Sequence, residues 1–85
     1  MLVTKLTVKI HRGLQARNTA LFVDKASSFT SDVILTKSGI SSDGKKIMRV
    51  MDLNIKDGDE IMLMVNGCDE HVTFKVLKSF LMNQL

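Results

Sequence analysis

Residues 2–29, LVTKLTVKIHRGLQARNTALFVDKASSF, decide the fold, because they change from a strand pattern to a helix pattern across one short loop. In residues 2–10 apolar and polar side chains alternate, which is typical of a half-buried strand. Residues 11–15 form a loop with Gly13 as its turn residue. Over residues 16–28 the apolar spacing becomes helical, and one face of this expected helix carries Thr19, Phe22, Val23 and Ala26.

The rest of the chain repeats the two patterns in shorter segments. Ser38-Gly39 is a hairpin turn signal, and the polar segment after it suits the edge of a sheet. Asp69 is a candidate N-cap for a last helix. The remaining elements are expected as strands at 32–37, 40–43 and 60–66, a short helix at 46–52 and a long helix from Glu70 onward. The order lacks the regular alternation of a doubly wound parallel sheet, so an antiparallel sheet with helices on one face is favoured.

Size and composition indicate one small globular domain. A chain of 85 residues, 45% hydrophobic and 25% charged, can build one core. The single cysteine, Cys68, excludes a disulfide framework and suits a reducing compartment. Residues 1–10 are interrupted by lysines and lack a signal-peptide core, and no stretch approaches the ~20 apolar residues of a membrane helix. We therefore expect a cytoplasmic protein that does not insert into a membrane.

Two segments are the most distinctive of the chain: residues 13–20, GLQARNTA, and residues 47–53, IMRVMDL. The first resembles the G-[IL]-H-A-R-P-A-[AT] active loop of the HPr phosphocarrier family. The second resembles the S-I-M-G-[VL]-M-S-L stretch of that family, and the match extends over the whole chain and is closest to the Crh branch. The resemblance implies a single HPr-like α+β domain over residues 1–85, an open-faced β-sandwich. In this fold three helices cover one face of a four-stranded antiparallel sheet.

The resemblance also implies a role in the bacterial phosphoenolpyruvate:sugar phosphotransferase system rather than an enzymatic activity. In such proteins the active-loop histidine accepts phosphate from enzyme I. In many Gram-positive members a kinase phosphorylates the serine that opens the short helix, and the product is a corepressor for a catabolite-control transcription factor.

The chain departs from the family pattern at the positions that would carry phosphate. Gln15 stands at the histidine position, as in the Crh branch, and an amide cannot form a phosphohistidine. Lys46 stands at the serine position, where a serine kinase has no acceptor. Asn18 replaces a proline, so we expect a looser active loop, and Ser42 and Gly44 should loosen the edge strand.

The leading hypothesis is a regulatory binding protein that docks phosphotransferase-system or catabolite-control partners without being phosphorylated and without a cofactor. Four of its apolar residues match the patch through which HPr-type proteins meet partners, and methionines suit such surfaces. The expected contact face consists of Gln15, Arg17, Ala20, Lys46, Ile47, Met48 and Met51. The alternative, that part of the apolar set is core, stays open because Ile47 and Met51 share one helix face.

Other readings also stay open. The chain could be a phosphocarrier that uses His11, although the pattern does not set His11 beside the helix start, or it could be regulated at Ser41 or Ser42. A strand-swapped homodimer would match the Crh branch.

Cys68 and His71 alone do not make a zinc site, so no metal is expected. The basic residues expected to cluster, as an anion site or as a solvated face, are Arg12, Arg17, Lys45, Lys46 and Arg49. Direct nucleic-acid binding is not expected, since no aromatic residue interleaves with these charges.

Overall fold

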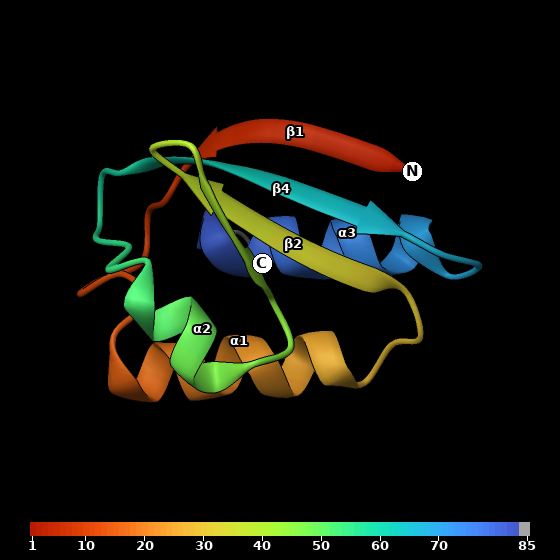
Figure 1. Cartoon of the computed structure of the whole chain (residues 1–85), viewed down its shortest axis with the longest axis horizontal. Coiled ribbons are helices and arrows are strands. Elements are labelled where there is room, and N and C mark those ends of the chain that lie inside the picture. The colour runs from red at the N-terminus through yellow and green to blue at the C-terminus, as the bar shows by residue number, and fades with distance from the viewer. Residues whose placement is uncertain (84–85) are drawn as a thin grey trace.

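The computed structural model describes residues 1–83 and has a four-stranded antiparallel sheet with three helices on one face (Figure 1). The strand order β1-β4-β2-β3 leaves β1 and β3 at the two edges. The elements are β1 (Leu2–Thr7), α1 (Ala16–Ser27), β2 (Asp32–Lys37), β3 (Ile40–Asp43), α2 (Ile47–Asp52), β4 (Glu60–Asn66) and α3 (Glu70–Leu81). The predicted open-faced β-sandwich is therefore confirmed. None of the described helices is long and apolar enough to cross a membrane.

The core lies between the sheet and the helices, as the periodicity predicts. Leu6 of β1 pairs with Ile61 of β4, Leu35 of β2 pairs with Leu63, and all four side chains are buried. The four residues predicted for the inner face of α1 are also buried. Alternate residues on the opposite sheet face, such as Val3, remain exposed. Burial of each large side chain contributes about 1.5–3 kcal/mol before the entropy of ordering is subtracted.

Asp69 begins α3, as predicted, but its carboxylate does not cap that helix. It instead accepts hydrogen bonds from the backbone N–H groups of Thr30 and Ser31, each at 2.9 Å, and from the Ser31 hydroxyl. The Ser31 hydroxyl, followed by the Thr30 N–H, holds the pKa of Asp69 well below its usual range. The loop between α1 and β2 is thereby fixed to the start of α3, so the cap prediction is right in position and wrong in chemistry.

The edge strand β3 is not loosened at Ser42 and Gly44, contrary to the prediction. Ser42 pairs with Leu35 in the ladder, and Gly44 donates its N–H to the Val33 carbonyl at 2.7 Å. A Cβ on Gly44 would lie 2.5 Å from Val33 Cγ1. The absence of a side chain at Gly44 therefore lets the chain close against β2.

Candidate functional site

The loop before α1 is held tightly against the segment that precedes β4. Arg12 and Gly13 adopt positive φ angles of 68° and 58°. The Gly13 N–H donates to the Ile10 carbonyl at 2.8 Å, and the Leu14 N–H donates to the Ile55 carbonyl at 2.9 Å. A Cβ on Gly13 would lie 2.5 Å from the Ile55 carbonyl oxygen, so the backbones approach as closely as only glycine allows.

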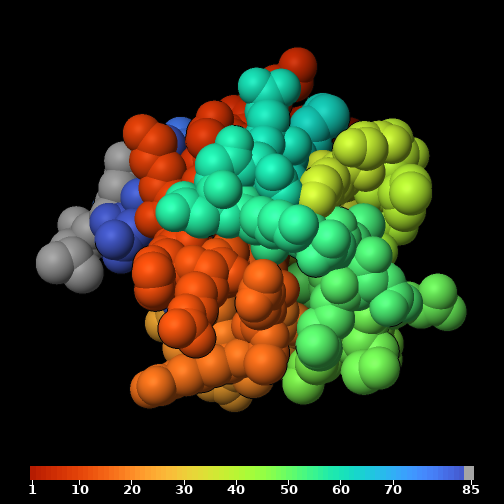
Figure 2. Space-filling model, turned by 90° about the vertical axis from the view of Figure 1, so that its left-hand side faces the viewer, coloured from red at the N-terminus to blue at the C-terminus, as the bar shows by residue number. Residues whose placement is uncertain are grey.

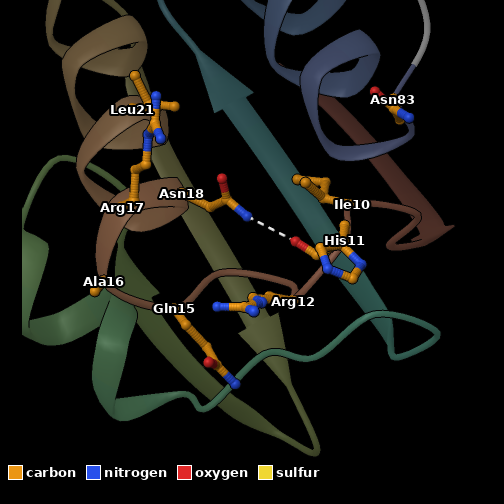
Figure 3. Close-up of a pocket in the computed structure, with 9 residues that line it drawn as sticks. All are labelled: Ile10, His11, Arg12, Gln15, Ala16, Arg17, Asn18, Leu21 and Asn83. Carbon is orange, nitrogen blue, oxygen red and sulfur yellow. Dashed lines mark hydrogen bonds between the residues drawn. The ribbon is translucent and has the colours of Figure 1, made fainter.

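Asn18 fastens this loop to the first turn of α1. Its Nδ2 donates to the His11 carbonyl at 2.9 Å, which Figure 3 shows as a dashed line, and to the Gly13 carbonyl at 2.8 Å. Thr19 adds a hydrogen bond from its hydroxyl to the Leu14 carbonyl at 2.7 Å. The prediction of a looser loop is wrong, because the side chain that replaces proline supplies two hydrogen bonds of its own.

Gln15 occupies the N-cap position of α1 and is exposed, with no capping hydrogen bond from its side chain. Beside it lies a hollow of about 610 Å³, which we call the loop hollow. His11 lies in this hollow too, close to the helix start, although the sequence pattern does not set it there (Figure 3). Among the described residues, no carboxylate lines the loop hollow. The lining residues are Ile10, His11, Arg12, Gln15, Ala16, Arg17, Asn18, Leu21 and Asn83.

The helix α2 turns most of its apolar side chains toward solvent. Val50 is its one buried residue, whereas Ile47, Met48 and Met51 are 44%, 70% and 39% exposed. The alternative that part of this apolar set is core is therefore wrong, since Val50 supplies the core contact of α2. Lys46 occupies the N-cap position, and its exposed cation lies at the helix end that favours anions.

The loop before α1 (orange) and α2 (green) lie side by side on one face of the molecule, as Figure 2 shows. A second hollow, of about 540 Å³, is lined by Val23 of α1 together with Lys45, Lys46, Ile47, Met48 and Arg49. The predicted basic cluster is thus divided between two hollows. Lys45 is further occupied by a hydrogen bond from its Nζ to the Phe29 carbonyl at 2.8 Å.

Every residue predicted for the contact face is exposed, and the loop and α2 that supply most of it are neighbours. Sequence reasoning missed Leu21 and Val23, which line the loop hollow and the α2 hollow. Leu21 could have been found as an apolar residue outside the inner stripe of its helix.

Cys68 is exposed, and its Sγ lies 3.3 Å from Thr30 Oγ1. Among residues 1–83, no three His, Cys, Asp or Glu side chains gather into a metal-binding group.

The arginine-containing loop before α1 lies beside α2, which carries two methionines, on an open-faced β-sandwich (Figure 2). This is the arrangement that the resemblance to small phosphotransferase-system proteins of the HPr type implies. The family model described as "PTS HPr component phosphorylation site" matches residues 2–83, and the chain belongs to this HPr family. Relatives of this chain are described as phosphocarrier protein HPr and as HPr-like protein Crh.

Similar proteins include two from the genus Bacillus. The HPr-like protein Crh of Bacillus subtilis (strain 168) is 39% identical over 85 residues, which cover 100% of both chains. A crystal structure of the phosphocarrier protein HPr from Bacillus anthracis str. Ames superposes with a TM-score of 0.92 at 32% identity, covering 94% of this chain and 95% of that one. A crystal structure of Bacillus subtilis Crh, described as a swapped, intertwined dimer, gives a TM-score of 0.81 at 39% identity, covering 100% and 98%.

Proposed function

We propose that this chain is a single-domain regulatory binding protein of the phosphotransferase system or of carbon catabolite control. In this proposal the contact face docks a protein partner, no phosphate is carried, and neither catalysis nor a cofactor is involved. The observation that carries it is the outward apolar surface of α2, on which Met48 is 70% exposed. Exposed apolar side chains gathered in one place are typical of interaction sites, and methionine adapts to different partners.

Gln15 and Lys46, which replace the two phosphate-accepting residues of the family, support binding to a partner that does not recognise phosphate. Gln15 keeps a neutral hydrogen-bonding side chain at the start of α1. Lys46 adds a permanent positive charge where a phosphoserine would bring about −1.5 to −2. A partner that recognises phosphoserine through its own cations would be repelled, whereas an acidic partner surface would be attracted.

The docking face can be tested by titrating enzyme I, and separately the catabolite-control transcription factor, against this protein and two variants. Met48→Asp should weaken binding about tenfold, which corresponds to ~1.4 kcal/mol, because it sets a charge in the apolar contact. Met62→Asp makes the same chemical change on the open sheet face and should leave affinity within about twofold. Equal losses in both variants, or no binding of either partner, would remove this proposal.

A second candidate is a phosphocarrier, favoured by the position of His11 in the loop hollow beside Arg12. Regulation at Ser41 or Ser42 belongs to the same alternative. Incubation with enzyme I and phosphoenolpyruvate, and separately with the serine kinase and ATP, followed by intact-mass measurement, separates the candidates. A gain of ~80 Da, the mass of one phosphoryl group, would establish the alternative, and an unchanged mass supports the binding protein.

The proposed partners include a second copy of this chain, with which it would form a strand-swapped homodimer. The Crh relative is described as a swapped dimer, and β1 of this chain is an edge strand that pairs only with β4. Exchange of β1 would need a rearrangement only in the loop that follows it. A molar mass by light scattering that doubles as concentration rises supports this, and a constant monomer mass opposes it. We place the protein in the bacterial cytoplasm, which suits its free Cys68.

A further inference from the structure

A separate groove of about 410 Å³ follows the seam between α1 and α3. Its lining shares Ile10 and Asn83 with the loop hollow, so the two depressions are continuous. The α2 part of the contact face lines neither depression, whereas Gln15 and Arg17 of that face line the loop hollow. We call the groove between α1 and α3 the seam groove, and its lining consists of Ile10, Lys25, Lys75, Val76, Ser79, Phe80 and Asn83.

Helical spacing explains the two walls of the continuous depression. Arg17, Leu21 and Lys25 follow one another at intervals of four residues, so they form one ridge along α1. Val76 and Phe80 form the opposite ridge along α3 by the same spacing. Figure 3 shows Arg17 and Leu21 on one side of the opening. From Arg17 to Lys25 the α1 ridge rises over eight residue steps, about 12 Å, which is the length of roughly two helical turns.

The walls combine apolar surface with fixed positive charge. Leu21 is 44% exposed, and the Phe80 ring packs on Phe22 with ring centroids 6.3 Å apart. The Lys25 Nζ lies 5.6 Å from the centre of the Phe80 ring, so a cation is held at the edge of the apolar wall. Lys75 is exposed on the facing helix.

No carboxylate lines the continuous depression within residues 1–83. No ion pair within the described residues involves a cation that lines this depression. The positively charged side chains along it are Arg12, Arg17, Lys25 and Lys75. Such a surface lowers the energy of a negatively charged occupant and disfavours a positively charged one.

We propose that the seam groove binds an acidic, amphipathic helical segment of a partner protein. The apolar face of that segment packs on Val76 and Phe80 in the groove and on Leu21 where the groove opens into the loop hollow, and its carboxylates pair with Lys25 and Lys75. A second copy of this chain fits poorly, because its net charge is +3 and the same cations would meet across the interface. A lipid surface fits poorly as well, since it would be met by a protruding apolar face rather than by a depression between two ridges.

The test uses a synthetic 14-residue helical peptide with leucines at i, i+3, i+7 and i+10 and glutamates on the flanking positions, titrated into ¹⁵N-labelled protein. We expect amide shifts concentrated at Leu21, Lys25, Val76 and Phe80. Affinity should fall several-fold as sodium chloride rises from about 50 to 300 mM, because screening weakens exposed charge pairs. A peptide with lysine in place of every glutamate should not bind.

Charge reversal locates the site. Lys75→Glu should weaken the peptide about threefold, and Lys25→Glu/Lys75→Glu about tenfold. Lys78→Glu makes the same change on α3 at a residue outside the groove lining and should stay within about twofold. Thermal unfolding of each variant shows whether loss of the Lys25 contact with Phe80 has altered the fold, and Lys75→Glu tests the site without touching that contact.

The inference would be overturned by no shift at the groove amides, by equal binding of the lysine peptide, by equal losses in Lys75→Glu and Lys78→Glu, or by binding to phosphatidylglycerol vesicles without binding to the peptide. The result is distinguishable from the proposed function through Met48→Asp. This variant should bind the peptide normally even though it loses the partner of the contact face. Loss of peptide binding in Met48→Asp would assign the peptide to the contact face and refute the seam groove.

Discussion

Replacing Gly13 with alanine measures how strongly the loop before α1 is held by its close approach to the segment before β4. An alanine at φ +58° costs about 1–2 kcal/mol in backbone conformation. Its Cβ would also lie 2.5 Å from both the Ile55 carbonyl oxygen and the Lys56 Cα, and crowding of this kind adds about 1–3 kcal/mol. The total, about 2–5 kcal/mol, is a large part of the 5–15 kcal/mol that stabilises a typical domain.

The matched control is Gly39→Ala in the β2–β3 hairpin. Gly39 also has a positive φ, +79°, but a Cβ there would meet nothing within 4 Å. Urea unfolding followed by circular dichroism should therefore give a loss of about 1–2 kcal/mol for Gly39→Ala and about twice that or more for Gly13→Ala. In thermal unfolding, each lost kcal/mol should lower the Tm by roughly 4–8 °C. If Gly13→Ala loses no more stability than Gly39→Ala, the close approach at Gly13 is not what holds the loop.

Asn18→Ala removes two hydrogen bonds to loop carbonyls, so it should lower the free energy of unfolding in urea by about 1–2 kcal/mol and speed amide hydrogen exchange in the loop. Unchanged exchange would show that these hydrogen bonds do not hold the loop. Asp69 has a lowered pKa in the folded state, so its contribution to stability is complete above its unfolded pKa of about 3.9 and is lost as the pH falls below that value. Asp69→Asn should therefore make stability less dependent on pH below about 4, and an equally steep acid unfolding curve would refute this. Lys46→Glu exchanges a cation for an anion at the start of α2 and should raise stability by about 0.3–1 kcal/mol, whereas a lower Tm would contradict the electrostatic reasoning.

The sequence by itself determined the order of the elements, the inner faces of β1 and α1, and the resemblance to the family. The alternation in residues 2–10 and the helical stripe in residues 16–28 each report locally which side of an element is apolar, and that side must be buried. The segments 13–20 and 47–53 resemble HPr motifs because each combines several residues at fixed spacing, and the family match over residues 2–83 confirms the family. The exposed Ile47, Met48 and Met51 were likewise predicted as a surface patch, although burial of some of them stayed open.

Only the tertiary structure decided the roles that depend on which segment lies opposite a residue. The Asp69 carboxylate serves Thr30 and Ser31 rather than its own helix, and Gly44 is required by the Val33 side chain. The seam groove exists only because α3 packs beside α1, which no local pattern encodes. Periodicity states that a face is buried or exposed, but it does not state what lies opposite that face. The distances between residues 30 or more positions apart are set by the packing of the whole core.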